Sequence, residues 1–128
     1  MKIIKQTYLI KAPIEKVWQA FVDPEIINKW GAGPAVMSEE EGFKFSLWGG
    51  DIHGTNTKVV KEKKLVQDWY GGDWAKPSKV TFTFFKDKGN AKVELLQENV
   101  PDEEFESINQ GWKDYYLGPI KNLFEKAD

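Results

Sequence analysis

The middle half of the chain carries the pattern that most restricts its fold. From residue 35 to residue 99, apolar and polar residues alternate in short runs, and segments rich in glycine or lysine separate these runs. Alternation with a period of two is typical of strands with one buried face, and the short separating segments favour an antiparallel meander. The sequence therefore predicts six strands here, at residues 35–38, 43–48, 52–60, 65–70, 79–85 and 91–99.

The two ends of the chain follow other patterns. Residues 2–11 alternate and predict a first strand, after which Pro13 suits the first turn of a helix. A second short helix follows and ends at Gly31, a residue type that favours helix ends. Near the C-terminus, apolar residues recur at helical spacing and predict one long amphipathic helix over residues 103–125. We expect this helix to kink at Pro119, because proline has no N–H to donate to the carbonyl four residues earlier.

The apolar stripe of the long helix predicts which of its residues are buried. Phe105, Ile108, Trp112 and Tyr115 follow one another at helical spacing, with Trp112 near the centre of the stripe. The stripe must face the sheet, because an amphipathic helix buries its apolar side. We expect Trp112 to be among the most buried residues of the helix.

The order of these elements predicts the fold class. Helices segregated from a run of strands are typical of α+β proteins, and a twisted sheet of many strands tends to curl. We predict a single domain over residues 1–128, with a curved antiparallel sheet of about seven strands. The long C-terminal helix closes this sheet, and two short helices follow the first strand. A packed core or a ligand cavity can fill the space between sheet and helix.

The composition excludes several kinds of chemistry. The 128 residues include no cysteine, one histidine and 18 basic residues, all of them lysine. Without cysteine there is no thiolate metal site and no cysteine nucleophile. Arginine is the usual reader of guanine edges, so its absence argues against a nucleic-acid partner. His53 follows the apolar Ile52 and so points to the opposite face of its strand, which favours a position at the rim. We expect no catalytic constellation, no metal and no cofactor.

The sequence also predicts where the protein resides. No apolar run reaches the roughly 20 residues that span a bilayer. The N-terminal residues do not form the apolar segment of a signal peptide. The absence of cysteine fits a reducing compartment. We expect a cytoplasmic protein with no membrane span.

Polar side chains at apolar strand positions mark a candidate binding site. Alternation with the apolar residues of the same strands turns Asn56, Gln67 and Gln97 inward. A buried amide without a partner costs about 1–3 kcal/mol, so these groups should bond to one another, to water or to a ligand. A shift of one residue in register would instead turn them outward. The candidate ligand-binding residues, including aromatic side chains of the sheet and of the long helix, are Asn56, Gln67, Trp69, Phe82, Gln97, Trp112 and Tyr116.

Two segments of the sequence resemble a known family. Residues 11–25, followed by Trp30, resemble the opening of the helix-grip superfamily, which includes START domains and the birch-pollen allergen. Residues 109–124 are more specific, and are similar to the C-terminal domain of the activator of the 90-kDa heat-shock protein's ATPase. Smaller matches between these segments are Gly42 with Phe45, the spacing of Gly50 and Gly54, Leu65-Val66 with Trp69, and Val100-Pro101.

The resemblance implies the helix-grip fold and leaves three functions open. The eukaryotic activator has a separate N-terminal domain that makes much of its contact with the chaperone, and this sequence begins at the first strand of the C-terminal type of domain. Our first expectation is a non-enzymatic protein that binds a small apolar or amphipathic ligand between sheet and helix. The alternative is a co-chaperone-like module that binds a heat-shock chaperone and modulates its ATPase. A cyclase or hydratase of the kind found elsewhere in the superfamily is a lesser alternative.

Overall fold

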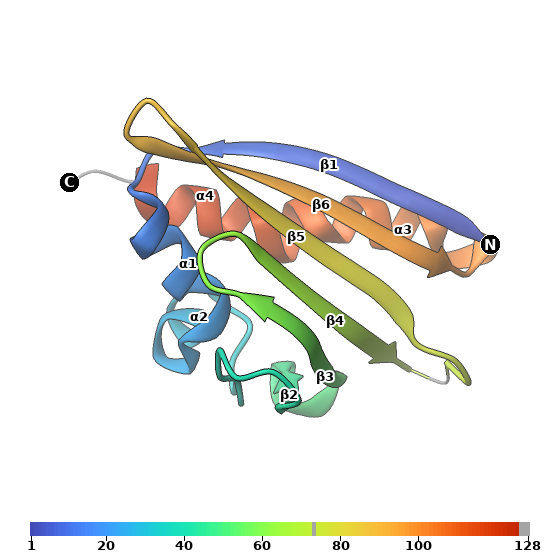
Figure 1. Cartoon of the computed structure of the whole chain (residues 1–128). Helices are drawn as coiled ribbons and strands as arrows, with labels where there is room; N and C mark the ends of the chain where they lie inside the picture. Colours follow the sequence, from blue (N-terminus) through green and yellow to red (C-terminus); the bar gives the residue numbers. More distant parts are fainter. Residues whose placement is uncertain (73, 126–128) are drawn as a thin grey trace.

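The structure is a computed structural model that describes residues 1–72 and 74–125 (Figure 1). Within these residues, a single antiparallel sheet of six strands has the order β1-β6-β5-β4-β3-β2. Its strands are β1 (Lys2–Ile10), β2 (Lys44–Leu47), β3 (Ile52–Val60), β4 (Lys64–Gly71), β5 (Ser78–Asp87) and β6 (Asn90–Val100). The helices are α1 (Ile14–Val22), α2 (Pro24–Trp30), α3 (Phe105–Gly111) and α4 (Leu117–Glu125). Three short helical turns are η1 (Trp48–Gly50), η2 (Asp102–Glu104) and η3 (Trp112–Tyr116).

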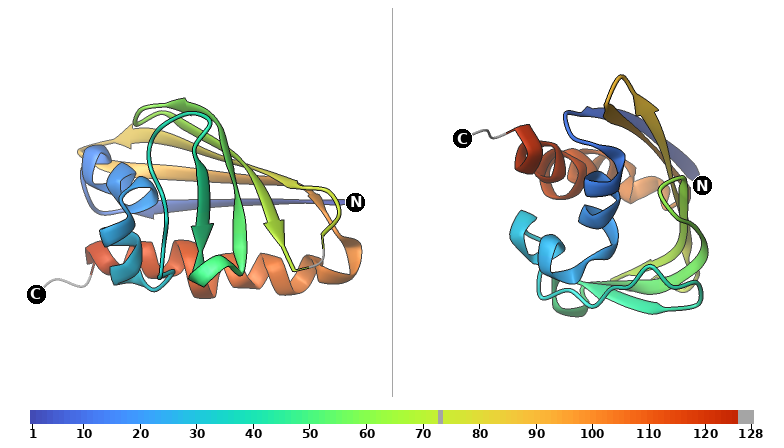
Figure 2. Two further views of the ribbon diagram at one scale, coloured as in Figure 1. Left: turned by 90° about the horizontal axis from the view of Figure 1, so that it is seen from below. Right: turned by 60° about the vertical axis from the view of Figure 1, so that its left-hand side comes forward.

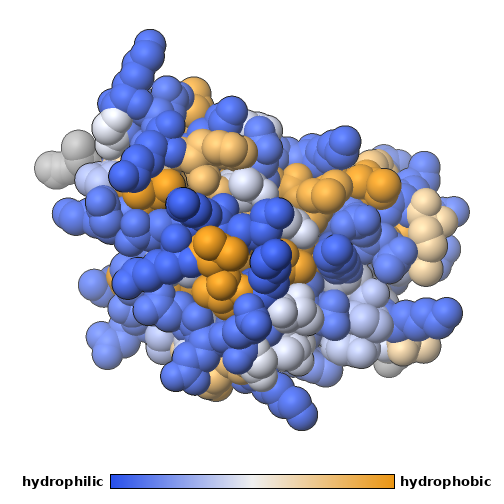
Figure 3. Space-filling view, viewed as in Figure 1, coloured by the Kyte–Doolittle hydropathy of each residue, from blue (hydrophilic) through white to orange (hydrophobic). Residues whose placement is uncertain are grey.

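The sheet curls around the long C-terminal helix, which confirms the predicted α+β helix-grip architecture. Figure 2 shows the helix formed by α3, η3 and α4 lying across the concave side of the sheet, with α1 and α2 covering one end of the enclosed space. Alternate residues of β1 face this space, so Ile4 and Ile10 are buried while Ile3 and Leu9 are exposed. Figure 3 views the molecule from the side of the strands, where separate apolar patches interrupt a mostly hydrophilic surface.

The strand expected at residues 35–38 is a single bridge, so the described sheet has six strands where about seven were predicted. Val36 and Ser46 exchange two backbone hydrogen bonds of 2.9 and 3.0 Å, and the pairing stops there. Side chains take the neighbouring backbone groups: the N–H of Ala35 donates to Asn28 Oδ1, and the carbonyl of Ser38 accepts from Asn56 Nδ2. Such bonds compete with a strand ladder and end it.

The enclosed space is filled at one end by aromatic side chains. Trp18 and Phe21 of α1 pack edge-on against Phe84 of β5, with ring centroids 5.1 and 5.0 Å apart. Phe82 stacks on Tyr116 of the long helix at 5.6 Å. These contacts join α1, the sheet and the long helix into one core.

Among the described residues, no helix has the length and apolar character needed to cross a bilayer.

The long helix departs from regular geometry before the predicted position. It continues through Pro119, and the irregular part is the π-helical turn η3, where the N–H of Leu117 donates to the carbonyl of Trp112, five residues earlier. Gly118 lies so close to the backbone of Lys113 that an added Cβ would overlap its carbonyl oxygen. The wide turn therefore leaves no room for a Cβ at position 118, which explains why glycine fits there.

The π-helical turn also changes which side chains face the sheet. Trp112 is 3% exposed, which confirms its predicted burial. Tyr115, expected in the same buried stripe, is 65% exposed, while Tyr116, a predicted site residue of the same helix, is buried as expected. A π-helical turn contains about one more residue than an α-helical turn, so the residue four positions after Trp112 stays on its buried face and the residue three positions after it turns away. The prediction for Tyr115 was wrong for this reason.

Candidate functional site

Three amide side chains are buried on the concave face of the sheet. Asn56 of β3, Gln67 of β4 and Gln97 of β6 are each no more than 1% exposed, which confirms that they point inward. The register of the sheet explains this placement, since Asn56 pairs with Gln67 across β3 and β4. A buried amide is stable only if its donors and acceptors are satisfied. Their partners therefore determine what the site can bind.

The first two amides form one hydrogen-bonded chain. Gln67 Nε2 donates to Asn56 Oδ1 at 2.8 Å, and Gln67 Oε1 accepts from Trp69 Nε1 at 2.8 Å. Asn56 Nδ2 donates to the carbonyls of Ser38 and Glu40 at 2.8 and 3.2 Å. Protein groups thus occupy both ends of both amides, and the chain holds the indole ring of Trp69 in one orientation.

The third amide orients a second indole ring. Trp112 Nε1 donates to Gln97 Oε1 at 2.7 Å, and Gln97 Nε2 donates to Ser78 Oγ at 3.0 Å. The Ser78 hydroxyl in turn donates to the carbonyl of Glu98 at 2.6 Å. Trp112 and Trp69 lie side by side, with ring centroids 4.9 Å apart. The amides therefore position an aromatic surface by bonding to its indole N–H groups.

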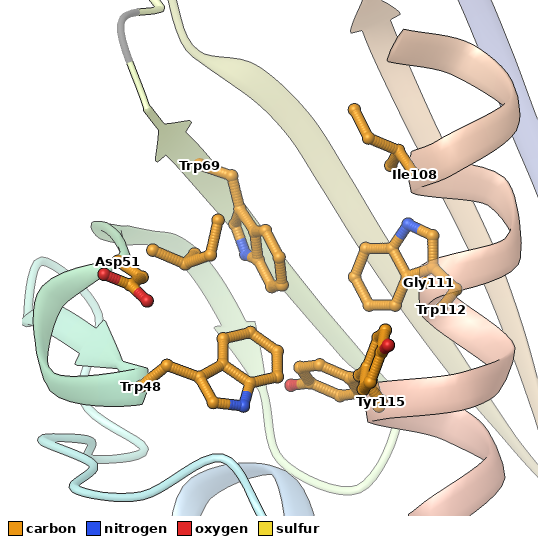
Figure 4. Close-up of a pocket in the computed structure, with 9 residues that line it drawn as sticks. Trp48, Asp51, Trp69, Ile108, Gly111, Trp112 and Tyr115 are labelled. Carbon is orange, nitrogen blue, oxygen red and sulfur yellow. The ribbon is translucent and has the colours of Figure 1, made fainter.

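This aromatic surface forms part of a pocket of about 250 Å³. In Figure 4, Trp48 and Asp51 approach the pocket from the side of η1, Trp69 from the sheet, and Ile108, Trp112 and Tyr115 from the helix. The residues that line it are Trp48, Asp51, Ile52, Trp69, Ile108, Gly111, Trp112, Tyr115 and Tyr116. Three of the predicted site residues, Trp69, Trp112 and Tyr116, are in this lining. The other four are buried but do not line it: Asn56, Gln67, Phe82 and Gln97.

Trp48 is the main pocket residue that sequence reasoning missed. It lies in a turn, where strand and helix periodicity give no direction for a side chain. Its backbone N–H donates to the carbonyl of Ala32 at 2.9 Å, and its Nε1 donates to the carbonyl of Gly31 at 3.0 Å. The Gly49-Gly50 pair that follows, with φ angles of 67° and 106°, is the sequence signal of this tight turn.

Tyr116 lines the pocket but has a fully buried hydroxyl group. Its ring is 1% exposed and packs against Trp30 and Trp112, with centroids 4.7 and 4.9 Å away. Within the described part of the chain, its hydroxyl oxygen has no hydrogen-bond partner. Burial raises the pKa of this hydroxyl well above its ordinary value, so the group stays neutral.

Acid–base and metal-binding groups are sparse around the pocket. His53 is exposed, stacks on Tyr70 with ring centroids 5.5 Å apart, and lies outside the pocket lining. Asp51 is the one carboxylate in the lining, and it is exposed. No cluster of three or more histidine, aspartate or glutamate side chains suited to a metal ion occurs within residues 1–72 and 74–125. The geometry suits binding of an apolar group.

The sequence and the fold together identify a family. The family described as "Activator of Hsp90 ATPase homolog 1-like protein" matches residues 11–125. The chain belongs to this activator family. It is 37% identical over 110 residues to the activator of 90 kDa heat shock protein ATPase homolog of Dictyostelium discoideum, covering 84% of this chain and 29% of that protein. It is 28% identical over 123 residues to human activator homolog 1, covering 94% of this chain and 36% of that protein. The chain thus spans about a third of the length of these relatives.

Solved structures share the activator-family fold over nearly the whole chain. The crystal structure of an HSP90 activator from Plasmodium falciparum has a TM-score of 0.89 and 26% identity, covering 98% of this chain and 97% of that one. The solution structure of the Aha1 dimer from Colwellia psychrerythraea has a TM-score of 0.82 and 21% identity, covering 98% and 97%. The second likeness is one of fold alone.

The segment that carries the resemblance to the activator family also builds one wall of the pocket. Residues 109–124 include all of η3 and most of α4, and four of them line the pocket: Gly111, Trp112, Tyr115 and Tyr116. Residues 11–25 form α1 and begin α2, which cover the far end of the core. In this activator-family chain, the most specific part of the resemblance therefore coincides with the pocket and the π-helical turn.

We predict that Gln67→Leu destabilises the activator-family fold by about 1–3 kcal/mol. Leucine removes the partners of Trp69 Nε1 and Asn56 Oδ1 and leaves both groups buried. Urea unfolding followed by tryptophan fluorescence measures the loss. Gln110→Leu is the matched control, because Gln110 is exposed on α3, and it should change stability by less than about 0.5 kcal/mol. Equal effects of the two substitutions would contradict the role assigned to the buried amide.

Proposed function

We propose that this chain binds a 90-kDa heat-shock chaperone in the cytoplasm and raises the chaperone's rate of ATP hydrolysis. The observation that carries the proposal is the likeness to the Plasmodium falciparum HSP90 activator, which covers 97% of that chain at 26% identity. The Plasmodium falciparum chain, which matches this chain over nearly its whole length, is thus described as an HSP90 activator. The 37% identity to the Dictyostelium discoideum activator homolog supports the same proposal.

In this proposal the chain acts by binding and supplies no catalytic group. A protein accelerates a partner's reaction when it binds the partner's reactive conformation more tightly than its resting one. The pocket described above offers one exposed carboxylate, Asp51, with no acid–base pair beside it. These residues therefore fit a binding role better than they fit the cyclase or hydratase alternative, which needs acid–base groups.

A titration of the chaperone tests the proposal. Adding the chain to the 90-kDa heat-shock chaperone of the same organism should raise ATP hydrolysis to a plateau, because the effect saturates when the complex is fully formed. An inhibitor that occupies the chaperone's ATP site serves as the control and should abolish the whole increase. An increase that survives this inhibitor would come from a contaminating ATPase. An unchanged rate at saturating chain would contradict the proposal.

We also propose a second function, the binding of a small apolar molecule in the pocket of about 250 Å³. The specific support is its lining of three tryptophans and two tyrosines, which gives an apolar concave surface of the kind that binds small molecules. Trp69, Trp112 and Tyr116 would touch the ligand. The buried side chains of Asn56, Gln67, Phe82 and Gln97 would support those three from behind. Calorimetry with isopropylbenzene tests this function, since burial of apolar surface gives a negative heat-capacity change.

A further inference from the structure

A second hollow of the surface lies at the turn that joins β3 to β4. Its volume is about 690 Å³, and it shares no lining residue with the aromatic pocket. The pairing of β4 with β5 ends where Lys64 lies opposite Thr83, so residues 85–87 of β5 pair with β6 alone. Figure 1 shows the β3–β4 turn ending before β5 and β6 reach their own hairpin. The hollow therefore lies beside the end of β5, where the neighbouring strand is missing.

This hollow carries an excess of positive charge. Five lysines and one carboxylate line it and define the lysine groove: Lys58, Lys61, Lys63, Lys64, Lys86 and Glu62. In the part of the chain that the structure describes, none of the five lysines forms a salt bridge. The whole chain has a net charge of −2, so this positive charge is local. Like charges gathered in one hollow repel one another and attract an anionic group.

The lysine groove also has fixed walls and an apolar part. The N–H of Lys63 donates to the carbonyl of Val60, and the N–H of Phe84 donates to the carbonyl of Lys63, both at 2.9 Å. These bonds tie the turn to β5. Val60 and Phe85 line the groove and are 38% and 40% exposed. A bound segment can therefore pack aliphatic groups there, and walls that are already ordered lower the entropy cost of binding.

The shape and the charges together restrict the partner. A flat membrane surface does not reach into a hollow. A nucleic acid would supply anionic phosphates, but the chain has no arginine to read its bases, and its 20 acidic residues repel a long polyanion. A short protein segment that combines carboxylates with aliphatic side chains matches both the lysines and the pair Val60 and Phe85.

We propose that the lysine groove binds an acidic segment of a partner protein, in which aspartate or glutamate residues flank one or two aliphatic residues. The carboxylates pair with the lysines, and the aliphatic side chains pack against Val60 and Phe85. This inference goes beyond both proposed functions, because it involves neither the aromatic pocket nor the ATPase of the chaperone. Failure of either of those proposals leaves it standing.

Two synthetic peptides of equal length test the inference. One has glutamates on both sides of two central leucines, and the other has glutamine at every glutamate position. Fluorescence anisotropy at low ionic strength should show saturable binding of the labelled glutamate peptide. The glutamine peptide should bind at least about tenfold more weakly, because it lacks the charges that attract the lysines. Equal affinities of the two peptides, or no binding of the glutamate peptide, would overturn the inference.

Substitution of exposed lysines locates the binding. A triple variant with Lys61→Gln, Lys63→Gln and Lys86→Gln should bind the glutamate peptide about tenfold more weakly, as expected for the loss of three exposed ion pairs. Raising the salt concentration to about 0.3 M should weaken binding to the wild-type chain as well, because salt screens such pairs. Unchanged binding by the triple variant would show that the peptide lies elsewhere.

A second triple variant is the matched control. Lys5→Gln, Lys79→Gln and Lys113→Gln replace three exposed lysines outside the groove lining. Both triple variants lower the net charge by the same amount, so they differ only in where the charge is lost. The control variant should bind the glutamate peptide within about twofold of the wild-type affinity. An equal loss in both variants would mean that the peptide responds to total charge, which would contradict a defined groove.

Two measurements on the wild-type chain guard against variants that do not fold. In a titration with the glutamate peptide, the largest changes in amide chemical shift should fall within residues 58–64 and 83–86. Largest changes elsewhere would overturn the inference. An oligothymidylate with the same number of negative charges should bind at least about threefold more weakly, because it has no aliphatic side chain to bury against Val60 and Phe85. Equal or tighter binding of the oligothymidylate would overturn the assignment of a protein segment as the partner.

Discussion

Replacing Trp112 by alanine should lower the free energy of unfolding by about 3–5 kcal/mol. The side chain is 3% exposed and packs against Trp69, Phe82 and Tyr116 at centroid distances of 4.9, 5.7 and 4.9 Å. Its removal leaves a cavity and also deprives Gln97 Oε1 of its donor. Both effects act in the same direction, so this substitution should be among the most damaging in the long helix. Urea unfolding curves give the free energy directly.

Tyr115 supplies the control for this prediction. It is aromatic, lies three residues away on the same helix and is 65% exposed, so Tyr115→Ala should change stability by less than about 0.5 kcal/mol. A loss below about 1 kcal/mol for Trp112→Ala would mean that the ring is not part of the packed core. The pocket wall would then be a loose surface, and the structural basis of the ligand proposal would be lost.

Gly118→Ala should destabilise the protein by about 3 kcal/mol, at the upper end of the usual range for overpacking. The added Cβ would overlap the backbone carbonyl oxygen of Lys113, which cannot move aside as a flexible side chain can. The π-helical turn would have to open or shift to make room. Thermal unfolding monitored by circular dichroism measures the change in the midpoint.

Gly111→Ala is the matched control, because the same residue type in the same helix has space around it. The atom nearest to an added Cβ there is Tyr115 Cδ2 at 3.9 Å, an ordinary contact distance. Alanine favours the helix by up to about 1 kcal/mol relative to glycine, so this substitution should stabilise the protein. The two substitutions should therefore have opposite signs. A stabilising Gly118→Ala would show that the wide turn is absent in solution.

The fold could be predicted because most of its strands have one buried face. Alternation fixed the direction of Asn56, Gln67 and Gln97, and all three are buried as expected. The bridge at Val36 could not be predicted in the same way. Its ladder is cut short by bonds from Asn28 and Asn56, which lie elsewhere in the chain and reach it only after folding.

The site was harder to predict than the fold. The alternation of side chains along a strand shows that an amide is buried, but it does not show whether a ligand or a neighbouring indole is its hydrogen-bond partner. Hydrogen bonds to Trp69 and Trp112 occupy Gln67 and Gln97, and these are visible only in three dimensions. Sequence periodicity likewise says nothing about Trp48, which a turn presents to the pocket. The exposure of Tyr115 depends on the widened turn η3, and the Gly118-Pro119 pair in the sequence indicates only that the helix is irregular near this point.

The widened turn η3 lets the two halves of the long helix be aligned separately with the sheet. Gln6 of β1 donates to the carbonyl and the side chain of Asn109 in α3, while Lys121 of α4 donates to the carbonyl of Leu9 on the same strand. In an uninterrupted α-helix, the rotation of about 100° per residue would fix the angle about the helix axis between Asn109 and Lys121. The extra residue in η3 changes that angle. In evolutionary terms, this position should tolerate the insertion or deletion of a residue poorly, because either change would rotate one attachment away from β1.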